Sequence, residues 1–461
     1  MLIRENNNTN SVRFLFISLY VLFFVVIGGL NSYSEATDNT MAATGTSIYT
    51  YIYDESIGNL AIRITYPSTT RYTDGAPAII YTAPVVAGTI SFSDNSNINS
   101  LGFIAVEFLW PGQQALVSNT YIKSDGNFDY GGQNSIKAMR DIVRFIMGLS
   151  KNTDGNYIED ILPVTLLLND VGIYAYSQPG MEATNLLAQY GSDVQKLAYL
   201  VLMESPTEDK LYDLETGYYD ADSIAQYNPY YSYPDNYRSS GITPDYSTIG
   251  WCVNVNLYPE GRPCFNSKSS NPFVLRGDFP TIYGKRTYSM DLTNALYKNV
   301  FSNRQWPSDV ATPDEAKQIW SFRSVVSNYS LIASYNLETK IMLVFCSHDH
   351  RQVANDKPHI HQAYDGFHKT AGLWVRLNPD SSYVLLMDSS LDSSSLPDKD
   401  ANTEPSDWQY AEYWGYSDSI GNLIEKVSFA AILEMADRVY NNDWSVNLNN
   451  VLVNTAHPYL Q

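Results

Sequence analysis

Short apolar runs recur along the chain at lengths typical of sheet strands. Residues 171–176, 197–203 and 341–346 are almost continuously apolar, as expected of strands that are buried on both faces. Residues 78–82 and 103–109 are two further runs of this kind. We therefore predict that these segments are strands of one mostly parallel sheet.

Helical spacing appears between these runs. Ile136, Met139, Val143 and Ile146 recur at the spacing of one helix face, and residues 423–439 indicate a long last helix. The alternation of strands and helices predicts an α/β fold, with a mostly parallel central sheet and helices on both faces. The remaining predicted elements are a hairpin over 49–66, helices over 182–189, 313–320 and 359–369, and a late strand over either 373–377 or 383–386.

The composition changes after the run at 197–203. From about Pro206 to Gly284 the chain is crowded with Tyr, Asn, Ser, Pro and Asp. An insertion here lies at the carboxyl ends of the strands, where such sheets bind ligands, so we expect a Tyr-rich cap or lid. Its tyrosines either stack on a substrate or fill the lid itself. The predicted organisation is a core made of 46–205 and 335–445, a cap at 206–334 and a C-terminal tail at 446–461.

The strongest indication of chemistry surrounds Ser177. The buried run at 171–176 leads directly into Ser177-Gln178-Pro179-Gly180, and a helix is predicted immediately afterwards. A sharp turn from strand to helix presents a hydroxyl at the edge of the sheet, and the helix N-terminus favours negative charge beside it. The alternative is that Ser177 caps an ordinary helix.

With this order of elements, the chain resembles the α/β-hydrolase superfamily over most of residues 49–439. That superfamily usually carries its nucleophile in the motif G-x-S-x-G. In this chain Ala175 and Pro179 occupy the two glycine positions, and Gly180 follows one residue later. The resemblance implies an α/β-hydrolase fold in which Ser177 is the nucleophile.

The resemblance also implies partners for Ser177. The amide of Gln178 and a backbone amide of Val85 or Val86, in the loop after 78–82, are the expected oxyanion donors. An acid is expected after a later strand, and Asp349 follows the run at 341–346. The alternative for Asp349 is a helix cap, and Glu204 is the second choice of acid.

The base is the least defined member of the site. In this superfamily the His follows the last strand, but residues 387–421 contain no His. His457 in the C-terminal tail is the expected base, ahead of His359 and His361. A chain without a complete triad is the alternative.

The N-terminus resembles an export signal. Arg4 and Arg13 precede the apolar segment Phe14 to Leu30, and Ser34-Glu35-Ala36 offers a cleavage site. Residues 1–36 are therefore predicted to be a signal peptide or a membrane anchor, and the protein is expected to be secreted or tethered at the cell surface.

Charge and cysteine content limit the partners. The formal net charge of −20 disfavours binding to nucleic acid, which needs clustered Lys and Arg. Cys252 and Cys264 flank a turn and are expected to form a disulfide, whereas Cys346 is expected to be a buried thiol. No Cys or His spacing indicates a zinc site. Residues 152–160 partly resemble a calcium loop, but their spacing favours a polar turn.

Together these patterns predict an extracytoplasmic hydrolase of an ester or amide bond. It would act on a small-molecule, peptide or glycan substrate through a serine nucleophile, without a cofactor. The alternative is a hydrolase-fold protein that binds at a surface and does not catalyse.

Overall fold

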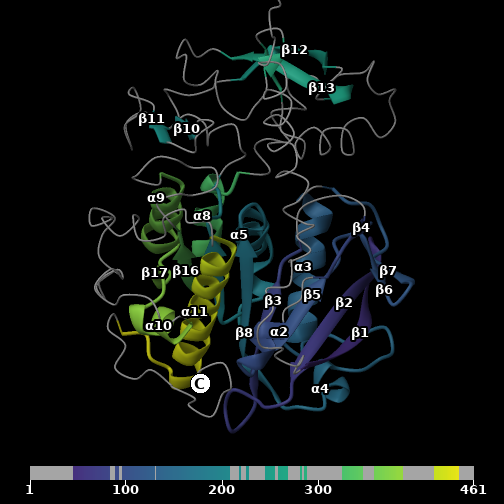
Figure 1. Cartoon of the computed structure of the whole chain (residues 1–461), viewed down its shortest axis with the longest axis vertical. Coiled ribbons are helices and arrows are strands. Elements are labelled where there is room, and N and C mark those ends of the chain that lie inside the picture. The colour runs from purple at the N-terminus through teal and green to yellow at the C-terminus, as the bar shows by residue number, and fades with distance from the viewer. Residues whose placement is uncertain are drawn as a thin grey trace, which may run out of the picture.

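Figure 1 shows the protein as a computed structural model. Among the described residues no helix is long and apolar enough to cross a membrane. The segment from Phe14 to Leu30 and the predicted helix at 313–320 lie outside the described residues. The structure describes residues 45–83, 89–92, 96–129, 131–207, 324–345, 358–387 and 420–445, and strand segments at 217–219, 225–227, 244–254, 258–267, 281–282 and 285–287.

The core is built on a sheet of eight strands in the order β1-β2-β5-β3-β8-β9-β16-β17. The strands from β5 to β17 run parallel, while β2 is antiparallel to both β1 and β5. Their bounds are β1 Gly45–Asp54, β2 Gly58–Pro67, β3 Ala76–Tyr81, β5 Ile104–Phe108, β8 Leu166–Tyr176, β9 Tyr199–Met203, β16 Lys340–Val344 and β17 Val375–Leu377.

Continuous apolar sequence produces the central strands. Every residue of β5 and β9 is buried, which explains why neither strand shows an alternating pattern. The predicted mostly parallel sheet is therefore confirmed.

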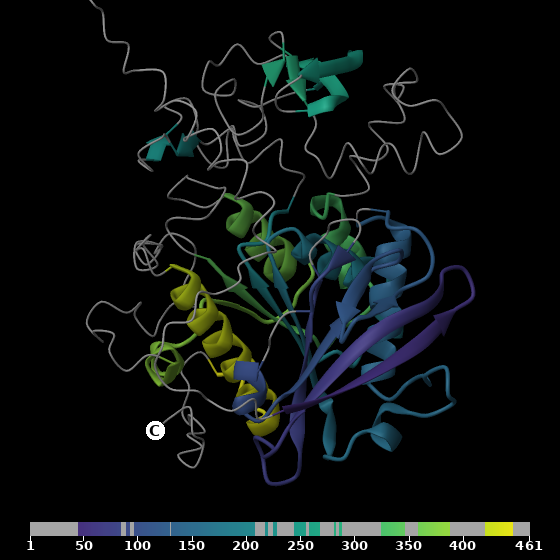
Figure 2. The same ribbon diagram turned by 45° about the vertical axis from the view of Figure 1, so that its right-hand side comes forward.

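Helices cover both faces of this sheet (Figures 1 and 2). Side chains of α3, α5, α8 and α9 share one apolar cluster with one face, and those of α2, α10 and α11 share a second cluster with the other. This arrangement confirms the predicted α/β architecture. The bounds are α2 Ser96–Ser100, α3 Gln133–Ile146, α5 Pro179–Tyr190, α8 Tyr329–Ala333, α9 Pro358–Tyr364, α10 Ser381–Met387 and α11 Ile420–Asn441, with a short α4 at Ile158–Ile161.

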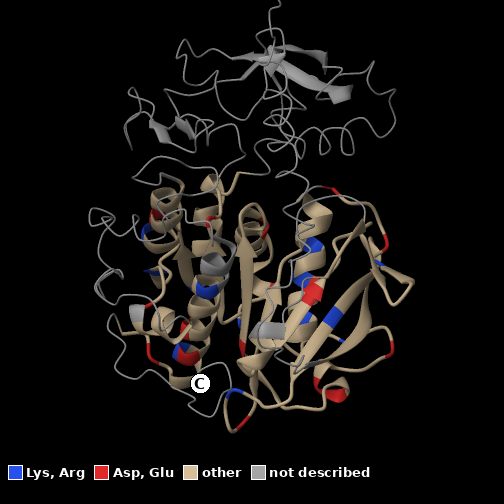
Figure 3. Ribbon diagram, in the orientation of Figure 1, with Lys and Arg blue, Asp and Glu red and all other residues tan. Residues whose placement is uncertain are grey.

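The hairpin of β1 and β2 is fastened at its turn by Asp54. One carboxylate oxygen of Asp54 accepts hydrogen bonds from the amides of Ser56 and Ile57, at 2.8 and 3.0 Å. The same carboxylate pairs with Lys137 and Arg140 of α3, at 3.0 and 3.5 Å. Figure 3 shows basic positions, in blue, along α3. The first helix of this face is thus tied to the edge of the sheet by charge as well as by packing.

The late strand is the first of the two predicted alternatives. β17 occupies 375–377, whereas residues 383–386 lie in α10, so the strand interpretation of that segment is wrong. Asp380 explains the helix, because its side chain accepts hydrogen bonds from the amide and hydroxyl of Ser382, at 2.9 and 2.6 Å. A short apolar run does not by itself distinguish a strand from a buried helix.

The described residues also form three small sheets outside the central one. One of them is made of strands that precede and follow β5 in the sequence, and it was not predicted. The other two fall within the Tyr-rich segment, which the sequence indicated to be irregular. That this segment forms a lid stays a prediction. The strands are β4 Thr89–Ile90, β6 Gln114–Val117 and β7 Thr120–Lys123; β10 Gly217–Tyr219 and β11 Ala225–Tyr227; and β12 Pro244–Asn254, β13 Tyr258–Ser267, β14 Thr281–Ile282 and β15 Lys285–Thr287.

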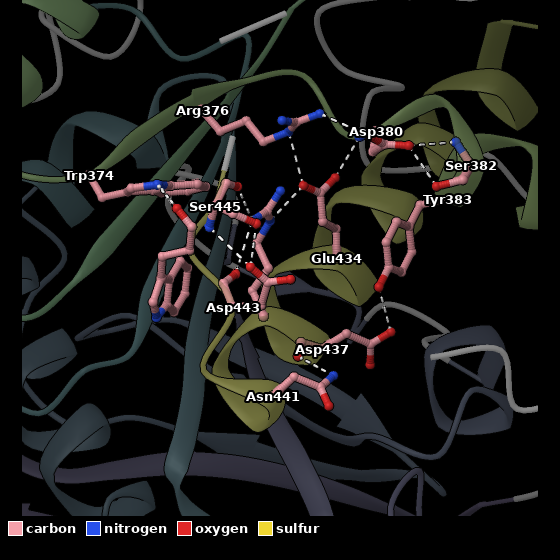
Figure 4. A network of polar contacts seen from close by, with 12 residues as sticks. Trp374, Arg376, Asp380, Ser382, Tyr383, Glu434, Asp437, Asn441, Asp443 and Ser445 are labelled. Atoms are coloured by element: carbon pink, nitrogen blue, oxygen red, sulfur yellow. Dashed lines mark hydrogen bonds and ion pairs between the residues drawn. The ribbon is translucent and has the colours of Figure 1, made fainter. Parts of the chain in front are cut away.

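Buried charges join α11 to β17 (Figure 4). The carboxylate of Glu434 lies 2.9 Å from Arg376 Nε and 2.8 Å from Arg438 Nε. It also accepts the backbone amide of Asp380 at 2.5 Å. Glu434, Arg376 and Arg438 are fully buried. The two guanidinium groups therefore depend on Glu434 for much of their charge compensation.

Asp437, on the same helix, makes a second group of contacts. Its carboxylate accepts two hydrogen bonds from the Arg71 guanidinium, at 2.7 and 2.6 Å. The hydroxyls of Tyr72 and Tyr383 donate to it at 2.7 and 2.8 Å. Arg71 and Tyr72 lie in the loop between β2 and β3. These contacts therefore connect the last helix, α11, to the N-terminal part of the sheet.

We predict that Glu434→Ala destabilises the protein by about 3–5 kcal/mol, because it leaves two buried guanidinium groups short of their carboxylate. The exposed pair between Lys369 and Asp365 provides the control, since Asp365→Ala should cost less than about 1 kcal/mol. Urea unfolding of both variants measures the difference. Equal losses would contradict a structural role for the buried cluster.

Asp170 of β8 is a buried acid of a different kind. Neither of its carboxylate oxygens has a hydrogen-bond partner among the described residues, and the side chain is 1% exposed. Burial raises the pKa of Asp170 well above its usual range, and the nearby charge of Asp437 acts in the same direction. Folding therefore favours the protonated acid at this position.

A raised pKa in the folded state means that Asp170 destabilises the fold increasingly as pH rises above the usual range of a carboxyl group. We predict that Asp170→Asn is more stable than the wild type at pH 8, by at least about 1.4 kcal/mol, the value of a tenfold change in protonation equilibrium. The gain should shrink towards zero at pH 4. Chemical unfolding at both values tests this, and a gain that does not depend on pH would refute it.

Candidate active site

The turn between β8 and α5 places Ser177 at the carboxyl edge of the sheet. Its φ of 61° lies in the left-handed region, which a residue other than glycine seldom adopts. The Ser177 amide donates to the Met203 carbonyl at 2.8 Å, and its carbonyl accepts from the Gly180 amide at 3.0 Å. The chain thus leaves one strand, reverses at Ser177 and enters a helix. Ser177 itself is half-buried.

Close packing explains the sequence around this turn. Pro179 occupies the first position of α5, where its missing amide hydrogen costs nothing. A Cβ at Gly180 would lie 2.0 Å from Ser205 Oγ and 2.3 Å from Ser205 Cβ. Glycine is therefore required at 180, because α5 passes directly against the end of β9. Ala175, which replaces the first glycine of the usual motif, is fully buried, so only a small side chain fits there.

Glu204 follows β9 as Ser177 follows β8. It also adopts the left-handed region, with φ of 45°, and its side chain is 2% exposed. The Glu204 amide donates to the Val344 carbonyl at 2.7 Å. From the sequence Glu204 was the second choice of acid, because it follows the apolar run at 197–203. Nothing local predicts its left-handed backbone, which glutamate seldom adopts.

Asn378 after β17 is a further left-handed residue at this edge, with φ of 57°. The side-chain oxygen of Asn378 accepts a hydrogen bond from the backbone amide of Phe345 at 2.9 Å. The backbone amide of Asn378 donates to the carbonyl of Leu343 at 2.8 Å. Asn378 therefore fixes the point where the chain leaves β16. Sequence reasoning missed this residue, although Asn is the type most tolerant of left-handed backbone.

The structure tests only part of the predicted site. Gln178 is the N-cap of α5 and is 7% exposed. Its backbone amide thus lies between the turn at Ser177 and the start of the helix. Val85, Val86, Asp349 and His457 lie outside the described residues. The strands that lead to Val85 and Asp349, β3 and β16, do end at the same edge as β8. The roles of all five residues stay predictions.

The described histidines lie on α9 and the π-helical turn Asp365–Thr370 that follows it. His359 is 2% exposed. Burial lowers the pKa of His361 to about 4, against the attraction of Asp365. His368 Nδ1 lies 3.2 Å from the Leu373 carbonyl. Which imidazole serves Ser177 stays a prediction.

Two other sequence predictions fall within the described backbone. Cys252 and Cys264 lie on the paired strands β12 and β13, opposite Arg262 and Gly250 respectively, and their disulfide stays a prediction. The Asn152 side chain accepts hydrogen bonds from the amides at 154 and 156, at 3.1 and 2.8 Å, as a polar turn requires. Among the described residues no group of His, Cys, Asp and Glu is arranged to hold a metal.

No protein-family model and no curated protein sequence matches the chain. Among solved structures, prolyl oligopeptidase B of Galerina marginata is similar at 11% identity and a TM-score of 0.38, over 86% of this chain and 37% of that one. Oligopeptidase B of Leishmania major is similar at 10% identity and a TM-score of 0.40, over 86% and 37%. This chain thus spans well under half the length of either peptidase.

An acetyl xylan esterase from a Paenibacillus species is similar at 11% identity and a TM-score of 0.35, over 81% of this chain and 90% of that one. The chain itself has a mostly parallel sheet with an antiparallel second strand and a serine at a strand-to-helix turn, which is the arrangement that the sequence predicts from its resemblance to the α/β-hydrolase fold.

We predict that Gly180→Ala destabilises the protein by about 1–3 kcal/mol, because the added methyl group collides with Ser205. A second substitution, Ser205→Gly, should restore part of the loss by removing both colliding atoms. Ser205→Ala keeps the Cβ and should restore less. A double-mutant cycle by urea unfolding measures this coupling. Additive losses in the cycle would show that the two residues are not in contact.

Proposed function

We propose that this protein is a hydrolase of ester or amide bonds that uses Ser177 as its nucleophile. The observation that carries the proposal is the left-handed Ser177 between β8 and α5. Strained backbone at a residue other than glycine costs about 1–3 kcal/mol and tends to be kept where function needs it. An N-cap serine opening an ordinary helix has no need of this conformation, since such caps take extended backbone.

In the proposed reaction the Ser177 oxygen attacks the carbonyl carbon and its proton passes to a base. The C–O or C–N bond to the leaving group then breaks, the leaving group takes the proton, and water releases the acyl group from Ser177. The amides of Gln178 and of Val85 or Val86 stabilise the oxyanion. The N-terminus of α5 adds a favourable dipole at the same place.

The proposed acid and base rest on the sequence alone. Asp349, after β16, is the proposed acid, with Glu204 as the alternative, and His457 is the proposed base. The ends of β9 and β16 are hydrogen-bonded through the Glu204 amide and the Val344 carbonyl, and Asp349 follows Val344 by five residues in the sequence.

We further propose a secreted or surface-tethered location and a small-molecule, peptide or glycan substrate. The location rests on the segment from Phe14 to Leu30 and its basic flank. The names of the similar structures, two oligopeptidases and an acetyl xylan esterase, are compatible with peptide or glycan-ester substrates. The Tyr-rich segment between β9 and α8 supplies side chains able to stack on either.

A hydrolase-fold protein without catalysis is the second candidate. One observation favours it: in the described residues after β17, 378–387 and 420–445, there is no His. The residues between them, 388–419, contain none either. In this case the carboxyl edge would serve binding alone.

We predict that a fluorophosphonate probe labels the purified protein at Ser177. The Ser177 oxygen forms a bond to phosphorus and fluoride leaves, so labelling needs an activated hydroxyl and not a particular substrate. Ser177→Ala should abolish labelling, and His457→Ala should reduce it by at least about 100-fold if His457 is the base. Peptide mass spectrometry locates the adduct.

Ser205→Ala serves as a control, because it removes a hydroxyl close to the same turn. That variant should label at close to the wild-type rate. A folded wild-type protein that stays unlabelled would rule out the serine hydrolase and favour the binding protein.

A further inference from the structure

The chain that leaves β3 is held at Ala83 by a tryptophan from another part of the sequence. The Thr82 amide donates to the carbonyl of Tyr174 at 3.2 Å, so the contact between β3 and β8 continues to Thr82. The carbonyl of Ala83 then accepts a hydrogen bond from the indole nitrogen of Trp110 at 2.9 Å. Ala83 is 7% exposed and Trp110 is fully buried. Because water does not reach this carbonyl, the indole donor determines how it is oriented.

Trp110 is itself held firmly in place after β5. Its amide donates to the side-chain oxygen of Gln113 at 2.9 Å, and the Gln113 amide donates to the Trp110 carbonyl at 2.9 Å. The indole ring packs edge-on against Phe108, with the ring centroids 4.6 Å apart. The Gln113 carbonyl accepts the Ser124 amide at 3.0 Å, which joins this turn to the chain that follows β7. The donor that reaches Ala83 thus belongs to a side chain with little freedom to turn.

The same stretch of chain also holds the far end of the loop after β3. Residues 84–88 lie outside the described residues, and β4 follows them. Thr89 of β4 pairs in parallel with Gln114 of β6, and the Gln114 side-chain amide donates to the Thr89 hydroxyl at 2.8 Å. The described residues on both sides of the loop are therefore bonded to the stretch from Trp110 to Gln114. The small sheet of β4, β6 and β7 supplies the second of these two attachments.

We propose that Trp110 is a positioning residue for the reaction at Ser177 and that Gln114 supports it from the other end of the loop. The inference rests on the proposed function, in which a backbone amide of the loop after β3 stabilises the oxyanion. Such an amide is most effective when it is in place before the charge develops. Trp110 does not contact the substrate, because its indole donor is used by the Ala83 carbonyl. It acts by fixing the residue from which the loop begins.

A positioning role of this kind has a kinetic signature. The oxyanion exists only in the transition state, so a displaced donor lowers the maximal rate and leaves half-saturation at the same probe concentration. The base is not altered, so the pH–rate profile keeps its position. A tryptophan that served only the stability of the fold would lower the melting temperature of Trp110→Phe without changing the maximal rate of the folded protein.

The experiment measures fluorophosphonate labelling of the full-length protein as a function of probe concentration and pH. Trp110→Phe keeps an aromatic ring and removes the donor, and its maximal labelling rate should fall between about 10- and 100-fold. Gln114→Ala keeps the backbone pairing of β4 and β6, so a smaller loss, of at least about threefold, is expected. Half-saturation and the pH profile should match the wild type in both variants.

Trp374→Phe is the matched control. Trp374 also donates its indole hydrogen to a backbone carbonyl, that of Trp444, at 3.1 Å, beside α11. The substitution therefore removes the same kind of bond at a place that does not bear on the loop after β3. This variant should label at the wild-type maximal rate.

Several results would overturn the inference and leave the serine hydrolase standing. They are a wild-type maximal rate in folded Trp110→Phe, an equal loss in Trp374→Phe, and a change in half-saturation or in the pH profile in place of the maximal rate. If Trp110→Phe gives no cooperative thermal transition, Gln114→Ala decides, and a wild-type rate or a failure to fold in that variant also overturns the inference. A folded wild-type protein that is not labelled removes the proposed function, and this inference with it.

Discussion

The reversal of the chain at Ser177 depends on two backbone hydrogen bonds that join this residue to two different elements. The Ser177 amide extends the ladder between β8 and β9, while its carbonyl already belongs to the first turn of α5. In the structure both bonds are made with a left-handed residue at 177, and a Cβ at 180 would collide with Ser205. The contact between Gly180 and Ser205 therefore fixes how closely α5 approaches β9. The position of the hydroxyl at the carboxyl edge follows from that approach.

The buried charges of α11 support the same edge from a distance. Glu434 holds Arg376 of β17, and β17 leads directly to Asn378. Asn378 in turn accepts the Phe345 amide at the end of β16. A polar connection thus runs from α11 through the last strand to the point where the predicted acid segment begins. Apolar packing alone would cover the sheet without fixing the register of α11, whereas these directional contacts allow one arrangement.

The sequence predicted the central strands because burial on both faces leaves a continuous apolar run, as in β9 and β16. It failed where a local cap was overlooked, where the pattern was weak and where distant contacts set the backbone. Residues 383–386 form a helix because Asp380 caps it, and the hairpin of β6 and β7 has too weak a pattern to be recognised. The turn at Ser177 was recognisable since its residues are adjacent in sequence. The conformations of Glu204 and Asn378 were not, because contacts between distant strand ends impose them.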